Sequence, residues 1–248
     1  MQDEPGVRPL DEWMGLLFVI IAGVVVATGS LAAALQAVLP EVGAVDLSII
    51  LPTLFQNGLL AWITLRRLRG LGVGWSELRP IPESFSQGVR ALGWGVALFV
   101  LNAVAAQVSA VLLAAVVGFD GVLALLEREQ AVVERILHPE AGPLQVAAGV
   151  FTAVAVAPVV EELFFRGYAY PVLKRYAGRH AAWMSGLLFA VVHFYVVNFL
   201  AIFAAGWMLA RLYERSRSLA VPIVAHASLN GIVAAVALAM RGLVSMVD

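Results

Sequence analysis

The stretch ALGWGVALFVLNAVAAQVSAVLLAAVVGF, residues 91–119, contains no Asp, Glu, Lys or Arg. A helix needs roughly 20 mostly apolar residues to cross a bilayer, and this stretch supplies more than that. Within lipid, every backbone N–H and C=O must be satisfied inside the segment itself, so a helix is the structure expected here. The chain is therefore expected to be an integral membrane protein.

The rest of the chain repeats this pattern. Its 248 residues are 61% hydrophobic and 13% charged, whereas a soluble domain carries about a quarter charged residues. Uncharged runs also occupy residues 13–40, 47–65, 141–160, 181–210 and 218–240. We expect an all-α, polytopic transmembrane bundle forming one integral membrane domain over residues 1–248. About seven spans are expected, within a range of six to eight. They lie near residues 13–39, 47–65, 91–117, 144–165, 181–196, 197–213 and 219–240.

Two segments have a different character. Residues 66–90 contain Gly70, Gly72, Gly74, Pro80 and Pro82 and are expected to form an irregular loop. Residues 121–137 place apolar side chains near one helical face, which predicts an amphipathic helix at the outer membrane interface. The first apolar stretch is too long for a signal-peptide core and is expected to remain as a helix.

The basic residues predict an orientation. With the N-terminus in the cytosol, 13 of the 16 Lys and Arg residues flank the inner side. Only Arg128, Arg135 and Arg241 fall outside. Because basic residues favour the cytosolic side, we expect a multi-pass cell-membrane protein with its C-terminus outside. The net charge of -1 and the lack of a basic block exclude nucleic acid as a partner. The chain has no cysteine, which removes disulfides and thiolate chemistry.

Placing an ionisable side chain within a membrane span costs free energy, so each such residue is a candidate for a functional role. Glu161 and Glu162 lie in EELFFRG (161–167), and the second is spaced i,i+4 from Arg166, as in an intrahelical ion pair. Glu161 has no cation at such a spacing. His193 ends FAVVH, which begins at Phe189, while HASLN contains His226 and Asn230. Taken singly, each residue is equally explained as a core or helix-packing group.

Depth in the membrane connects these residues. The fourth span is expected to run inward past Arg166 until Pro171 disrupts it. At 1.5 Å per residue, Glu161, His193 and His226 lie roughly 14, 18 and 12 Å from the cytosolic end, and Asn230 roughly 18 Å. Pro158, one turn before Glu161, is expected to bend its helix and free a backbone carbonyl for the site.

The three motifs EExxxR, FxxxH and HxxxN, in this order over residues 141–235, resemble the CAAX-protease and bacteriocin-processing (CPBP, or Abi) family. The resemblance implies an intramembrane glutamic endopeptidase whose catalytic core is 141–235. Glu161 would be the general base, His193 would hold the water, and His226 and Asn230 would stabilise the oxyanion. Glu162, Arg166 and Phe189 would support the site. A peptide or protein substrate is implied, with a membrane-bound one as an option, and no cofactor.

Two alternatives remain open on the residues alone. Glu161, His193 and His226 are the donor set of a His₂Glu zinc site with an open position for water. Against zinc, the three come from separate helices without an HExxH-type pair, and Asn230 is better explained as an oxyanion donor. The second alternative is a transporter or partner-binding protein that uses the polar cluster for packing or proton handling.

Overall fold

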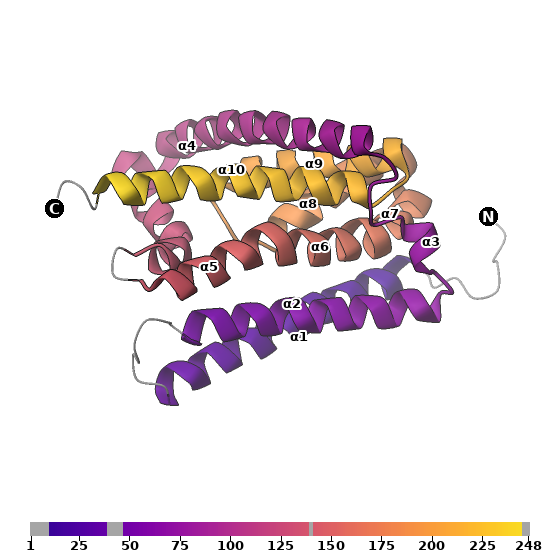
Figure 1. The fold of residues 1–248 in the computed structure, drawn as a ribbon, viewed down its shortest axis with the longest axis horizontal. Helices are drawn as coiled ribbons and strands as arrows, with labels where there is room; N and C mark the ends of the chain where they lie inside the picture. The colour runs from indigo at the N-terminus through magenta and orange to yellow at the C-terminus, as the bar shows by residue number, and fades with distance from the viewer. Residues whose placement is uncertain (1–9, 39–46, 139–140, 245–248) are drawn as a thin grey trace.

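The computed structural model describes residues 10–38, 47–138 and 141–244, and every regular element in these ranges is helical. Helices α1 (Leu10–Val38) and α2 (Leu47–Gly70) pack against each other and form one edge of the molecule in Figure 1. Arg8, which the predicted orientation places in the cytosol, lies outside the described residues.

Helix α4 (Phe85–Ile136) begins at Ser84, whose side chain accepts a hydrogen bond from the Gln87 N–H at 3.2 Å. It bends at Gly118, where φ is 76° and ψ is 169°. The bend separates the predicted span 91–117 from the predicted amphipathic segment 121–137, and the second part turns across the end of the bundle (Figure 1). The predicted apolar face is only partly covered, because Val122 is buried while Val132 and Val133 are exposed.

One nearly continuous helical stretch carries the motif of the double glutamate. It consists of α5 (Pro143–Phe151), the π-helical segment η1 (Thr152–Val156), α6 (Ala157–Glu162), the π-helical segment η2 (Leu163–Ala169) and α7 (Tyr170–Ala177). The prediction that Pro171 disrupts this helix is wrong, because Pro171 lies in the first turn of α7. In the preceding π turn the backbone hydrogen bonds run from residue i to residue i−5, as from the Tyr170 N–H to the Phe165 carbonyl. This wider turn tolerates Pro171, which has no N–H to donate.

The apolar run 181–210 folds as two helices joined by a turn. After the short 3₁₀ segment η3 (Gly178–His180), α8 (Ala181–Val191) ends earlier than the predicted 181–196 span, so His193 lies on the turn. The 11 residues of α8 rise only about 16 Å, which is too short to cross a bilayer. Helix α9 (Phe199–Ser216) follows.

Small residues allow the helices to approach closely. A Cβ placed on Gly186 of α8 would lie 2.8 Å from the backbone nitrogen of Trp207 on α9. A Cβ on Gly95 of α4 would lie 2.2 Å from the Cβ of Ser228, on α10 (Ala220–Val244). Contacts of this kind are typical of helices packed in membranes, where close van der Waals fit replaces the hydrophobic driving force.

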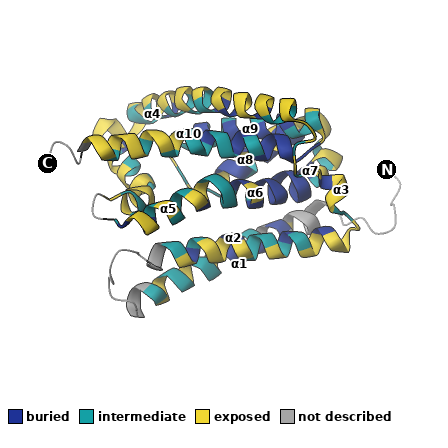
Figure 2. Cartoon of the chain, viewed as in Figure 1, coloured by how far each residue is buried: buried dark blue, intermediate teal, exposed yellow. Residues whose placement is uncertain are grey.

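Within the part of the chain that the structure describes, three helical stretches are long and apolar enough to cross a membrane: Phe85–Ile136, Pro143–Val191 and Ala220–Leu243. A shorter apolar helix covers Val19–Leu35. Many large apolar side chains on the outer surface are exposed, as on α4, while the buried residues gather where α6 to α10 meet (Figure 2). This distribution is that of a helical, multi-pass membrane protein.

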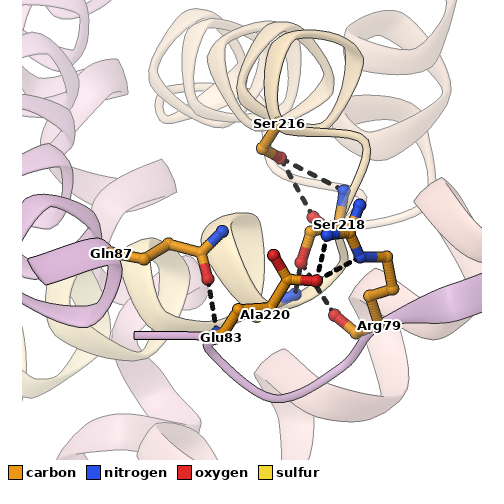
Figure 3. Close-up of polar contacts among 6 residues, drawn as sticks. All are labelled: Arg79, Glu83, Gln87, Ser216, Ser218 and Ala220. Atoms are coloured by element: carbon orange, nitrogen blue, oxygen red, sulfur yellow. Dashed lines mark hydrogen bonds and ion pairs between the residues drawn. The ribbon is translucent and has the colours of Figure 1, made fainter. Parts of the chain in front are cut away.

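Three connecting regions meet at one end of the molecule. The Leu219 N–H donates to the Leu78 carbonyl at 3.0 Å, and the Ser218 hydroxyl donates to the Arg79 carbonyl at 2.8 Å. Figure 3 shows the Ser218–Arg79 contact beside the Arg79–Glu83 ion pair. The predicted loop 66–90 is thus less irregular than expected, since it contains α3 (Trp75–Leu78) and is tied to the α9–α10 connection.

The connection after the fourth predicted span lies at this same end. Lys174 of α7 forms an ion pair with Glu214 near the end of α9. Loops 66–90, 166–180 and 211–218 therefore share one end of the bundle (Figure 1), as the predicted topology requires.

Candidate active site

The two π-helical segments set the geometry around the double glutamate. Each is followed by a proline, Pro158 after η1 and Pro171 after η2. In a π turn an N–H at position 158 would donate to the Ala153 carbonyl. Pro158 has no N–H, so this carbonyl can accept a hydrogen bond from another group. The Asn230 side-chain amide donates to it at 2.8 Å. The carbonyl that Pro158 was expected to free thus connects α10 to the glutamate helix.

Glu162 and Arg166 form the ion pair that their spacing indicates. Arg166 Nη1 lies 2.8 Å from Glu162 Oε1, and both side chains are fully buried. Arg166 Nη2 donates to the Gly206 carbonyl at 2.7 Å, and the guanidinium carbon lies 5.0 Å from the centre of the Phe189 ring. A buried charge needs this combination of a partner, hydrogen bonds and an aromatic face.

His226 joins the two glutamates. Its Nδ1 lies 3.0 Å from Glu162 Oε1, so a proton on Nδ1 donates to the carboxylate that also pairs with Arg166. Its Nε2 lies 4.0 Å from Glu161 Oε2. Arg166, Glu162, His226 and Glu161 therefore form one chain of polar groups. Sequence reasoning treated Glu162 only as the partner of the arginine and missed its contact with the imidazole.

Glu161 differs from its neighbour in access. Its side chain is 23% exposed, whereas that of Glu162 is fully buried. The buried Glu161 Oε2 has no hydrogen-bond partner among the described residues. A buried polar atom without a partner is uncommon in folded proteins and requires an explanation, such as an absent water or a catalytic role.

His193 lies next to Phe189, as His226 does. Its Nδ1 is 2.6 Å from the Phe189 carbonyl. Because a carbonyl only accepts, Nδ1 carries the proton and Nε2 is left as an acceptor. The Phe189 ring centre lies 4.6 Å from that of His193 and 5.8 Å from that of His226. Both imidazoles are thus neighbours of one aromatic ring.

Comparison with known proteins agrees with this arrangement. Residues 143–232 match the family model described as Type II CAAX prenyl endopeptidase Rce1-like. This segment is an Rce1-like domain. No curated protein and no solved structure matches the chain significantly. The Rce1-like domain contains all three motifs and every candidate residue from Glu161 to Asn230. This match relates the segment 143–232 to intramembrane proteases of the CAAX type.

The zinc alternative does not fit the Rce1-like domain as folded. Among the described residues, no three His, Cys, Asp or Glu side chains gather closely enough to hold a metal ion. Glu161, His193 and His226 are all within the described ranges, and they do not form such a group.

Gly206 is a site residue that sequence reasoning missed. Its carbonyl accepts the hydrogen bond from Arg166, and a Cβ added to it would lie 2.8 Å from the Phe189 Cβ. The available signal was the occurrence of small residues on both α8 and α9, which marks a close helix contact. That signal locates an interface but does not show that a catalytic-site arginine binds there.

Gly206→Ala is expected to lower the stability of the Rce1-like domain, because the methyl group must displace Phe189. Overpacking of this kind costs about 1–3 kcal/mol. Gly93→Ala in α4 is the matched control, since its Cβ would meet nothing within 4 Å. Melting midpoints in detergent measure the difference. A midpoint for Gly206→Ala as high as that of the control would contradict the tight contact.

Proposed function

We propose that the protein is an intramembrane glutamic endopeptidase in which Glu161 is the general base. The observation that carries the proposal is the difference in access between the two glutamates: Glu162 is fully buried with its Oε1 bound to Arg166 and His226, whereas the Glu161 side chain is 23% exposed. A general base must be reachable by water and substrate and must not be neutralised by a fixed partner.

The proposed reaction is hydrolysis of a peptide bond. Glu161 removes a proton from water, and the water oxygen bonds to the scissile carbonyl carbon. The carbonyl oxygen then carries a negative charge, and the same proton passes to the leaving amine as the C–N bond breaks. His193 Nε2, as an acceptor, helps to hold the attacking water. A site shielded from bulk water strengthens each of these interactions.

His226 and Asn230 are proposed to stabilise the oxyanion. An amide nitrogen has two N–H donors, and Asn230 uses one for the Ala153 carbonyl, which leaves the second for substrate. Because Glu162 holds His226 through Nδ1, the imidazole presents Nε2 to the same space, where it donates once it carries a proton. Glu162, Arg166 and Phe189 fix this arrangement without touching the substrate.

The substrate is proposed to be a peptide or protein, and a prenylated CAAX terminus is not required by these residues. Comparison of the proteomes of cells that contain the wild-type protein or Glu161→Ala tests the activity directly. Fragments that depend on Glu161 would identify the substrate. Identical proteomes, together with no cleavage by the purified protein, would contradict the proposed activity.

The proposed placement puts seven helical segments in the membrane, of which α8 is too short to cross it. The segment after Gly118 lies at the outer interface, the N-terminus in the cytosol and the C-terminus outside. A single cysteine at Gly70 tests it, because the native chain contains no cysteine. An impermeant thiol reagent added to intact cells should leave this cysteine unlabelled, while lysis should allow labelling. Labelling from outside would reverse the proposed orientation.

The proposed mechanism requires no metal, so strong chelation is expected to leave most of the cleavage activity, and purified protein is expected to lack stoichiometric zinc. Metal analysis and a cleavage assay before and after chelation measure both quantities. One zinc per chain, with activity lost on chelation and restored by zinc, would overturn the glutamic mechanism. Inhibition by added zinc would not, because zinc can bind the histidines.

A further inference from the structure

Glu129 connects α4, beyond its bend, to the turn that precedes α9. Its Oε1 accepts hydrogen bonds from the backbone N–H groups of Val196 at 2.6 Å and Val197 at 2.7 Å. Its Oε2 accepts from the Asn198 backbone N–H at 3.2 Å and from the Asn198 side chain at 2.7 Å. Four donors of one turn thus converge on a single carboxylate from a distant part of the chain.

The Glu129 carboxylate acts as an N-terminal cap for α9. The first N–H groups of a helix have no partner within it, and a negative charge is favourable at that end. Asn198 occupies the N-cap position of α9 without a side-chain capping bond of its own. Glu129 supplies the acceptor from another helix instead. In an apolar environment, amides without an acceptor would be costly, so the turn depends on Glu129 for its conformation.

The same turn carries His193. Phe194, the next residue, has a φ of 57°, a left-handed conformation that a bulky residue adopts only when its surroundings hold it there. The Tyr195 ring centre lies 6.3 Å from that of His193. Between the end of α8 and the amides held by Glu129, only a few residues determine where the imidazole lies.

We propose that Glu129 is a positioning residue of the active site, which holds the 192–198 turn so that His193 faces the same space as Glu161. The role of His193 in holding water rests on the proposed function. The contact between Glu129 and the turn does not, so the two parts can be tested separately.

Glu129→Gln is the test variant, because it keeps the shape but replaces one accepting oxygen with an NH₂ group that faces the backbone N–H groups. Glu127→Gln is the matched control, since Glu127 is exposed two residues earlier on the same helix. Hydrogen exchange at the amides of 196–198 is expected to lose protection in Glu129→Gln only. The kcat of peptide cleavage is expected to fall on the order of 10- to 100-fold with KM little changed, as displaced catalytic groups cause.

The outcomes separate the parts of the proposal. Unchanged exchange at 196–198 would refute the holding contact. Faster exchange with normal kcat would refute positioning for catalysis, and an equal fall in the Glu127→Gln control would show a general loss of folding instead. If the wild-type protein cleaves no peptide, the proposed function fails, while faster exchange would still support the contact between Glu129 and the turn.

A cavity between α1 and α2 carries a second inference, independent of the first. It has a volume of about 480 Å³ and is lined mainly by apolar side chains of both helices, with Gly23 in one wall. Arg66 and Arg67 line it toward the end of α2, and the Arg66 guanidinium carbon lies 5.8 Å from the centre of the exposed Trp62 ring. Among the described residues, no carboxylate forms an ion pair with either arginine.

We infer that this cavity binds an anionic phospholipid, with an acyl chain between the helices and the phosphate at Arg66 and Arg67. The apolar walls match the acyl chain of such a lipid, and the two neighbouring arginines at the end of a membrane helix match its phosphate. Basic pockets between membrane helices bind anionic headgroups. The exposed Trp62 is of the type that lies at the headgroup level.

Retention of phosphatidylglycerol against phosphatidylcholine by the purified protein, measured by native mass spectrometry, tests the inference. Gly23→Leu is expected to lose phosphatidylglycerol by filling the cavity, whereas Gly29→Leu, which also has open space at its Cβ, should retain it. Arg66→Gln with Arg67→Gln should lose the preference for the anionic lipid, and Arg69→Gln should keep it. Equal retention of both lipids, or no difference between either variant and its control, would overturn the inference.

Discussion

Glu161→Gln is expected to abolish peptide cleavage while leaving the melting midpoint in detergent near that of the wild type. The substitution keeps the shape of the side chain and removes only the group that takes the proton from water. General-base catalysis contributes about 10²- to 10⁴-fold, and the loss is expected to reach the upper end because no other described carboxylate at the site is accessible. Stability should hardly change, since the exposed face of Glu161 and its unpaired Oε2 make few native contacts.

The comparison that decides this prediction is with Glu162→Gln under the same assay. If Glu161→Gln remained active while Glu162→Gln was stable but inactive, the base would be Glu162 and the proposed roles of the two glutamates would be reversed.

Glu162→Gln is expected to be markedly less stable than the wild type. The change leaves the fully buried Arg166 without its charge partner and weakens the hydrogen bond from His226. Removal of one partner of a buried ion pair costs about 3–5 kcal/mol. A lower melting midpoint in detergent, together with loss of cleavage, is the expected result.

Arg166→Gln should lose stability to a similar extent, since it leaves Glu162 charged and removes the contact with the Gly206 carbonyl. The double variant, with Glu162→Gln and Arg166→Gln, should recover part of the lost stability because no unpaired charge remains. It should not recover cleavage, because His226 still lacks its carboxylate. Additive losses in the double variant would show that the two residues act independently and that the ion pair is not the source of the effect.

Most residues of the candidate site could be selected from the sequence because charge is so costly in lipid. A glutamate, a histidine or an asparagine in an apolar run stands out, and helical rise alone places these residues at similar depths. The Glu162–Arg166 contact follows from i,i+4 spacing. The bend at Gly118 could likewise be anticipated, since the composition changes there from uniformly apolar to amphipathic.

Other features depend on contacts between distant parts of the chain, which the spacing of residues along the sequence does not reveal. The bond between His226 and Glu162 requires knowing how α10 is rotated against α6. The turn that follows α8 and carries His193 is bound by Glu129, more than sixty residues away in the sequence. Gly206 is a small residue among several, and only the position of the Arg166 guanidinium distinguishes it.

The two π-helical segments make the length of the glutamate helix as important as its composition. Each contains a wider turn, equivalent to one residue more than an α-helix would use, and one residue corresponds to about 100° of rotation about the axis. A one-residue deletion within Thr152–Val156 would therefore turn α5 relative to Glu161 by that angle, even if every polar side chain were kept. The number of residues in these two segments thus helps to set the direction in which the glutamates face. Insertions and deletions here should therefore be tolerated less well than most substitutions.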